Sequence, residues 1–468
     1  MKKNFLMGGA LVMLALTGCA LDGGNSNSSM ESKSETAVIS SSASSETSNQ
    51  TSSALIESSK DEPAYFETID GYIDSLMENT TDKIPYWNQE SFKGKWNYID
   101  GVMLNSFMNL YKETNDQKYL SFVTRFVNYY IDKSGKFLNL KDSKKSGFDG
   151  KALDDICESR ILFDLYKYTN DSRYLKAINT TYLALTNTSR TNEGNFWHKK
   201  VYPNQVWLDG LYMANPFYLE YANNKTNAKA LVNGKEMTIY DDILNQYKMV
   251  RKNMYDENKH LYYHGYDSSK SIFWADKETG CSKSFWLRSM GWYIVSLVDV
   301  IEKYPDSYSA NKKELINIFK EAINGILEYQ DSNTKMFYQV VDKKDVTVFV
   351  DGSYYPKTGV GKNVTNYVET SGSSMIAYAL MKGYHLNLFD KAMYDKGVEI
   401  FNGICKKYLT ISSSGINLDG ICITAGLGPE SSPYRDGSIE YYLSESVGSN
   451  DAKGVGPFVM AYIEMKNN

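Results

Sequence analysis

Ionisable side chains stand inside apolar sequence at four places in this chain of 468 residues. One is "FWHKKVYPNQVWLDG" (196–210), where Asp209 follows Trp and Leu. An Asp is almost never fully buried unless a partner offsets its desolvation. The other three are "KALDDICESR" (151–160), "LYYHGYD" (261–267) and "SFWLRSMGWY" (284–293).

These stretches hold the residue types that act on an anionic sugar. The carboxylates of Asp154, Asp155 and Asp209 are suited to proton transfer. The guanidinium of Arg288 is suited to pairing with a substrate carboxylate. Other polar and aromatic groups suited to binding a sugar ring are His198, Lys199, Trp207, His264, Trp286 and Trp292.

Each of these residues also has a purely structural reading. Any of the three Asp residues is able to cap a helix. His264 fits a hydrogen-bonded core histidine, and Arg288 fits a cation–π pair on a Trp. Because the four stretches come from successive helical units, their coincidence favours one shared site.

The elements that position these residues repeat along the chain. "LYKETNDQKYL" (110–120) and "LYKYTNDSRYL" (165–175) match at most positions with an offset of 55 residues. Each stretch contains the end of an apolar helix, a turn at Asn-Asp and the start of another helix. Such self-similarity predicts a recurring helical hairpin.

Helical hairpins stack either as an open solenoid or as a closed ring. A solenoid needs polar capping units, whereas the C-terminal "GVGPFVMAYIEM" (454–465) is apolar and requires burial. The sequence therefore favours an all-α (α/α)6 barrel of six helical hairpins. Few strands are expected; 335–341 and 346–352 are predicted to pair as a β-hairpin.

The N-terminus has the pattern of an exported protein. Lys2 and Lys3 precede a short apolar run that ends in "LTGC" (16–19), which resembles a bacterial lipoprotein processing site. We expect a signal peptide over 1–18, a lipidated Cys19, a Ser-rich tether to residue 60 and a catalytic domain over 61–468. An ordinary signal peptide that ends near a Cys is the alternative. The apolar run is too short to span a membrane, so a lipid anchor would be the only membrane contact.

Composition and cysteine spacing give no indication of nucleic acid or a metal ion as a partner. The net charge of −5 offers no electrostatic attraction for nucleic acid. Cys157, Cys281, Cys405 and Cys422 lack metal-type spacing and lie in apolar sequence, which predicts buried free thiols.

The motifs together resemble the unsaturated rhamnogalacturonyl hydrolases of glycoside hydrolase family 105. The resemblance implies an (α/α)6 barrel, with Asp209 as acid and base and Asp154, rather than Asp155, as the second essential carboxylate. It also places His198, His264, Trp286 and Arg288 at the sugar subsite, with Lys199, Trp207 and Trp96 or Tyr98 as further wall candidates. Beyond the stretches above, the likeness is carried by "NYVETSGSSMIAYAL" (366–380) and "AGLGPESSPYRDGSIEYYLSESVGSNDAKGVGPF" (425–458).

The implied reaction starts from a sugar with a C4–C5 double bond, the product of a pectin-type lyase. Asp209 would protonate C4 and then accept a proton from the water that attacks C5. Burial beside Trp207 and Tyr212 and the charge of Asp154 predict a raised pKa for Asp209. No metal or organic cofactor is expected.

Three alternatives remain at this point. An unsaturated glucuronyl hydrolase acting on ulvan or glycosaminoglycan fragments would share the fold and mechanism. A non-catalytic sugar-binding lipoprotein would not need Asp154 and Asp209 together. An ordinary inverting glycosidase would act on saturated substrates.

Overall fold

The computed structural model describes residues 62–81, 84–88, 92–355, 358–413 and 415–467. The expected signal peptide, lipidation site and tether lie outside these residues. No helix in the described ranges is long and apolar enough to cross a membrane.

Six helical segments form the inner wall of an (α/α)6 barrel. Each contacts the next, and the last returns to the first. Most are buried on every side, as expected for helices inside a domain. In ring order they are α2 (Tyr98–Thr114), the α4–η2–α5 run (Asp154–Cys157, Glu158–Arg160 and Ile161–Thr169), α7 (Leu208–Asn224), α9 (Leu287–Lys303), α11 (Thr370–His385) and α14 (Ala452–Lys466).

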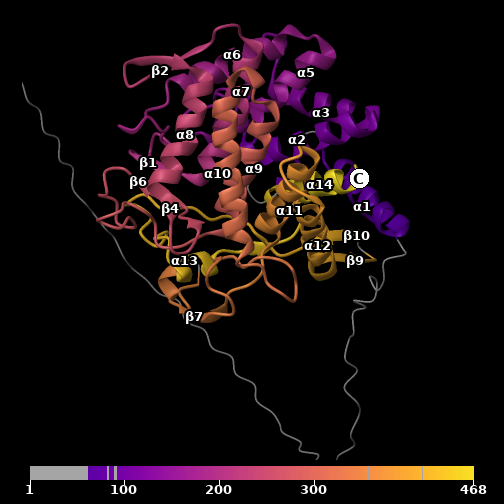
Figure 1. The fold of residues 1–468 in the computed structure, drawn as a ribbon. Helices are drawn as coiled ribbons and strands as arrows, with labels where there is room; N and C mark the ends of the chain where they lie inside the picture. The colour runs from indigo at the N-terminus through magenta and orange to yellow at the C-terminus, as the bar shows by residue number, and fades with distance from the viewer. Residues whose placement is uncertain (1–61, 82–83, 89–91, 356–357, 414, 468) are drawn as a thin grey trace, which may run out of the picture. The chain divides into compact units, whose positions relative to one another are not determined.

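Outer helices cover this wall, and each buries one face only. They are α1 (Glu62–Glu78), α3 (Gln117–Tyr130), α6 (Ser172–Thr186), α8 (Ile239–Met254), α10 (Ser309–Leu327) and α12 (Lys391–Tyr408). The first and last helices close the ring, since the Tyr462 hydroxyl of α14 donates to Asp70 of α1 at 2.9 Å. Figure 1 shows α1 beside α14. The predicted barrel is confirmed, and the open solenoid is excluded.

The 55-residue repeat has a local physical basis. Asn115 and Asn170 end α2 and α5 in the left-handed conformation, with φ values of 54° and 53°. In both repeats the Asp that follows accepts a backbone hydrogen bond as the N-cap of the next helix. Asn tolerates the left-handed region and Asp caps well, so the dipeptide ends one helix and begins another.

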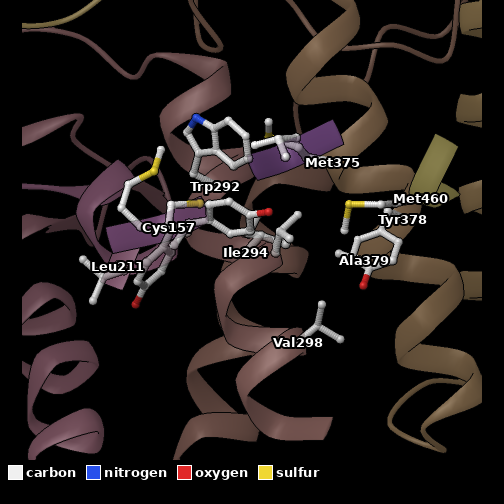
Figure 2. Close-up of a cluster of buried hydrophobic side chains, with 14 of the residues drawn as sticks. Cys157, Leu211, Trp292, Ile294, Val298, Met375, Tyr378, Ala379 and Met460 are labelled. Atoms are coloured by element: carbon white, nitrogen blue, oxygen red, sulfur yellow. The ribbon is translucent and has the colours of Figure 1, made fainter. Parts of the chain in front are cut away.

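The barrel interior is filled by apolar side chains from facing inner helices. Trp292 of α9 stacks on Tyr212 of α7 with ring centroids 4.5 Å apart. Figure 2 shows Trp292 with Met375 of α11 and Cys157 of α4 in this cluster. Trp292 is therefore a core residue. Cys157, Cys281 and Cys422 are buried free thiols, as predicted, and Cys405 is buried as well.

Short strands lie in the connecting loops, each paired with one antiparallel partner. One strand prediction is wrong: residues 347–350 pair with 362–365, and 335–341 instead makes single bridges, Trp286 to Val340 and Tyr338 to Val368. The pairs are β1 (Gln205–Trp207) with β6 (Gly265–Asp267), β2 (Lys229–Val232) with β3 (Lys235–Thr238), β4 (Tyr255–Asp256) with β5 (Leu261–Tyr262), β7 (Thr347–Val350) with β8 (Lys362–Thr365), β9 (Leu409–Ser412) with β10 (Gly415–Leu418), and β11 (Ile421–Cys422) with β12 (Val447–Gly448).

Candidate active site

Four of the residues singled out by the sequence lie in the first turns of inner helices. Tyr98 begins α2, Asp154 begins α4, Asp209 is the second residue of α7 and Arg288 is the second residue of α9. These helices run in the same direction, so their N-terminal ends meet at one end of the barrel. The partial positive charge of helix N-termini favours an anionic ligand there.

Asp209 lies against His264. Its Oδ2 atom is 3.2 Å from Nε2 of the imidazole, and β1 pairs with β6, so the two residues sit on adjoining backbone. The other ring nitrogen, Nδ1, is 2.6 Å from the hydroxyl of Tyr442 in α13 (Ile439–Ser444). The Asp209–His264 contact lacks hydrogen-bond geometry, and both atoms are buried without a hydrogen-bond partner among the described residues.

Asp209 does not cap its helix. Trp207 is the N-cap of α7, and Asp209 lies inside the first turn. The helix-cap reading of this residue is therefore wrong.

The expectation of a raised pKa for Asp209 is also wrong for the free protein. Burial is the largest single effect and raises the pKa of this carboxyl, but His264, His198 and the backbone N–H of Asp209 together lower it by more. The net pKa lies below the ordinary value for Asp. In the free protein Asp209 is therefore ionised at neutral pH.

Asp154 and Asp155 have different surroundings. The Asp154 carboxylate is 2.7 Å from Nζ of Lys199 and 3.6 Å from Nε2 of His198. Burial raises its pKa, but Lys199 and then His198 lower it below the ordinary value. Asp155 instead accepts hydrogen bonds from the backbone N–H groups of Lys151 and Ala152, which closes a local turn.

Aromatic rings connect these two carboxylates. His198 stacks on Trp207 with centroids 4.3 Å apart, and Tyr202 stacks on Trp207 at 5.2 Å. Trp207 in turn meets His264 edge to face. Burial lowers the pKa of His198 to about 4, with the charge of Asp154 opposing that shift. His198 is therefore neutral at physiological pH.

Arg288 is almost fully buried, with 2% of its surface exposed. Its guanidinium lies over the Trp286 ring, 4.8 Å from the centroid. One terminal nitrogen donates to the Cys422 carbonyl and approaches Ser371 Oγ at 3.4 Å. No carboxylate of the described residues forms an ion pair with it, so its charge lacks a direct partner.

Tyr98, rather than Trp96, belongs to the site. Burial, and then the charges of Asp154, Asp451 and Asp209, raises the pKa of the Tyr98 hydroxyl, while Arg288 opposes that shift. Trp96 is a core residue, since its indole N–H donates to Ser159 Oγ at 2.9 Å and its ring packs on Tyr130.

Sequence reasoning missed Tyr442 and Ser371. Both lie in motifs that carried the family resemblance, but neither is ionised at neutral pH or out of place in its local sequence. The 178-residue separation between His264 and Tyr442 leaves no local signal that they meet.

Two surface depressions lie away from these residues. One is lined by α3 and Thr169, and the other surrounds residues 222–229 with Tyr240 and Tyr308. Both lie toward the C-terminal ends of inner helices, opposite the first turns described above. Chemistry and charge, rather than either of these depressions, identify the candidate site.

Comparison with known proteins agrees with this architecture. The family model described as Glycosyl Hydrolase Family 88 matches residues 68–468. The chain belongs to glycosyl hydrolase family 88. It is therefore a glycosidase of the group that acts on unsaturated uronyl sugars.

Individual relatives of this family 88 chain agree with the resemblance to family 105. A family 105 glycoside hydrolase from C. acetobutylicum is 34% identical, with a TM-score of 0.71, and the alignment covers 85% of this chain and 100% of that one. Protein Atu3128 of Agrobacterium fabrum is 33% identical over 257 residues, 54% of this chain and 97% of that protein. The unsaturated rhamnogalacturonyl hydrolase YesR of Bacillus subtilis is 22% identical over 293 residues, 60% of this chain and 75% of that protein.

Proposed function

We propose that this family 88 protein removes the terminal 4,5-unsaturated galacturonyl residue from rhamnogalacturonan or pectin fragments made by a lyase. The motifs shared with unsaturated rhamnogalacturonyl hydrolases support the galacturonyl preference. The printed name of the B. subtilis relative supports the same substrate class.

One observation carries the proposal: several buried polar atoms at or near Asp209 and His264 make no hydrogen bond with the described residues. They are Nδ1 of His198, Nε1 of Trp286, and Oδ2 of Asp209 with Nε2 of His264, which face each other at 3.2 Å without hydrogen-bond geometry. Buried polar atoms are normally hydrogen-bonded, so a cluster of unpartnered ones favours a polar ligand that completes them. The buried Arg288, which has no carboxylate partner, favours an anionic one.

Each residue has a separate role in the proposed reaction. Asp209 donates a proton to C4 of the enol ether, and positive charge develops at C5 and the ring oxygen. Asp209, now ionised, accepts a proton from the water that attacks C5. The resulting hemiketal opens and releases the neighbouring sugar. Asp154 is held in its ionised form by Lys199, while Trp207 packs on His198 and Trp286 packs on Arg288, which holds those two side chains in place.

Asp209 must gain a proton before this reaction begins. A substrate carboxylate at Arg288 adds a negative charge near Asp209 and displaces water, and both effects raise a carboxyl pKa. Substrate binding should therefore be accompanied by proton uptake. His264 therefore lowers the pKa of Asp209 in the free protein, and bound substrate raises it.

The direct test uses lyase-digested rhamnogalacturonan, homogalacturonan, ulvan and chondroitin. Loss of the absorbance of the unsaturated uronide should be fastest for rhamnogalacturonan and absent for saturated oligosaccharides. A faster reaction on ulvan or chondroitin would instead assign a glucuronyl hydrolase. No reaction of any of the four, despite binding, would leave a sugar-binding role.

We also propose that the protein is an exported lipoprotein anchored through Cys19. The "LTGC" sequence and the Ser-rich segment after it support this. The Cys19→Ala variant should move from the membrane fraction to the soluble fraction. Equal membrane retention of the variant would contradict lipid anchoring.

A further inference from the structure

The seven arginines of this chain differ in their surroundings. Four form ion pairs with carboxylates, and Arg125 is exposed on α3. The remaining two, Arg288 and Arg435, are buried or half-buried and form no ion pair with a carboxylate of the described residues. The four paired ones are Arg160, Arg173, Arg190 and Arg251. Arg288 has a place in the proposed site, but Arg435 has no assigned role.

Arg435 is held in a tight loop between β11 and α13. Its Nε donates to the Gly426 carbonyl at 3.1 Å and to the Tyr441 hydroxyl at 3.2 Å. Its own carbonyl accepts from Gly428 N–H at 2.8 Å, and the Trp274 indole donates to the Gly428 carbonyl. These bonds fix the side chain through Nε, and the described residues provide no acceptor for its two terminal nitrogens.

The guanidinium lies beside the candidate active site. Gly426 separates it from Trp207: a Cβ placed on this glycine would lie 2.5 Å from Nη2 of Arg435 and 3.2 Å from Cζ3 of Trp207. Tyr441, which supports Arg435, directly precedes Tyr442, which bonds His264. The loop that carries Arg435 thus continues into α13, the helix whose Tyr442 contacts His264 beside Asp209.

The charges around Arg435 leave it able to bind an anion. Lys199 is close enough for the two positive charges to oppose each other, and Lys199 already pairs with Asp154. Glu445 also attracts Arg435, but burial raises the pKa of that carboxyl and the two form no ion pair.

Exposure gives the direction from one arginine to the other. Arg288 lies at the buried end of the site, whereas Arg435 is half-buried and its neighbour in the chain, Tyr434, is 38% exposed. When the terminal sugar of a substrate binds at Arg288, the remaining sugars of the oligosaccharide must extend toward this exposed side. We propose that Arg435, together with Lys199, binds an acidic group on the sugars beyond the scissile bond. The inference rests on the proposed function and adds a preference for acidic oligosaccharides.

The test compares two substrates with the same unsaturated galacturonyl end. One carries a neutral rhamnose as its only further sugar, and the other carries further sugars that include a galacturonate. The ratio of kcat/KM for the acidic over the neutral substrate should fall about tenfold or more in Arg435→Gln, because charge-assisted hydrogen bonds are lost. Lys283→Gln is the matched control, since Lys283 lies at the edge of the same region but already pairs with Asp436.

The outcomes separate this inference from the proposed function. Turnover of the neutral substrate by the wild-type protein tests the proposed function independently of Arg435. An unchanged ratio in Arg435→Gln, or an equal loss on both substrates, would overturn the role of Arg435. If the variant folds poorly, the wild-type protein provides a second test. Its KM for the acidic substrate should rise more steeply with salt concentration than its KM for the neutral substrate. Equal salt dependence of the two KM values would contradict the inference.

Discussion

The Asp209 carboxylate lies 3.2 Å from the His264 imidazole, and this contact stabilises the ionised form of the group proposed to act as an acid. A substrate that brings its own negative charge would shift this balance toward the protonated form of Asp209. This relationship makes the protonation of Asp209 dependent on substrate.

The Asp209→Asn variant should lose at least about 10⁴-fold in kcat, because one group serves both proton transfers and each such contribution is typically 10²–10⁴-fold. The melting temperature should change by only a few degrees, since the substitution removes no apolar packing and no helix cap. Asp155→Asn is the control, because its carboxylate closes a turn. Near-normal turnover by Asp209→Asn would reject the mechanism.

The Asp154→Asn variant should shift the alkaline limb of the pH profile of kcat, which reports groups in the enzyme–substrate complex, to lower pH. The substitution removes a negative charge and leaves the Lys199 ammonium unpaired. Both changes favour the ionised form of a nearby carboxyl, so the pKa of Asp209 should fall. Rate measurements across pH on both proteins test this; an alkaline limb that stays in place or moves upward would show that Asp154 does not influence Asp209.

The Arg288→Lys variant should raise KM about tenfold or more. Lys keeps the charge but loses the planar fork that binds a carboxylate in a bidentate manner and stacks on Trp286. Arg125→Lys, on the exposed face of α3, should leave KM unchanged. Steady-state kinetics on the neutral disaccharide isolate this effect from that of Arg435. Wild-type KM in Arg288→Lys would argue against carboxylate binding there.

The His198→Gln variant should remove a pH dependence of stability. The pKa of His198 is about 4 in the folded protein, below the unfolded value of about 6.5. Between these values the unfolded chain binds more protons, so wild-type stability falls as pH falls from 6.5 to 4 and is fully present above that window. Relative to the variant, the wild type should lose about 3 kcal/mol across it.

Denaturant unfolding of both proteins at pH 4 and at pH 7 measures that difference. His198 is 2% exposed, so solvent screening of the effect is small. A constant difference between the two proteins at both pH values would show that His198 is not held neutral by burial.

Local features of the fold could be predicted from the sequence. The Asn-Asp pairs at 115–116 and 170–171 end one helix and cap the next through bonds within a few residues. Apolar periodicity and the apolar C-terminal segment indicated a closed barrel. The unusual positions of Asp209 and Arg288 in apolar sequence indicated the site, since charges are rarely buried without a function or a partner.

Only the tertiary structure decided which of these groups meet. Asp154 faces Lys199 and His198 while its neighbour Asp155 turns to the backbone, a difference that one helical position creates. His264 and Tyr442 are brought together across 178 residues, and residues 362–365 displace 335–341 as the partner of 347–350.

The direction of the pKa shift at Asp209 also required the structure. Sequence context indicated burial, and burial alone raises the pKa of a carboxyl. His264, together with His198 and the backbone N–H of Asp209, reverses that effect, and the distance to His264 depends on how β1 and β6 pair at the head of α7. Burial is visible in local composition, whereas electrostatic interaction depends on separations of a few ångströms that long-range packing determines.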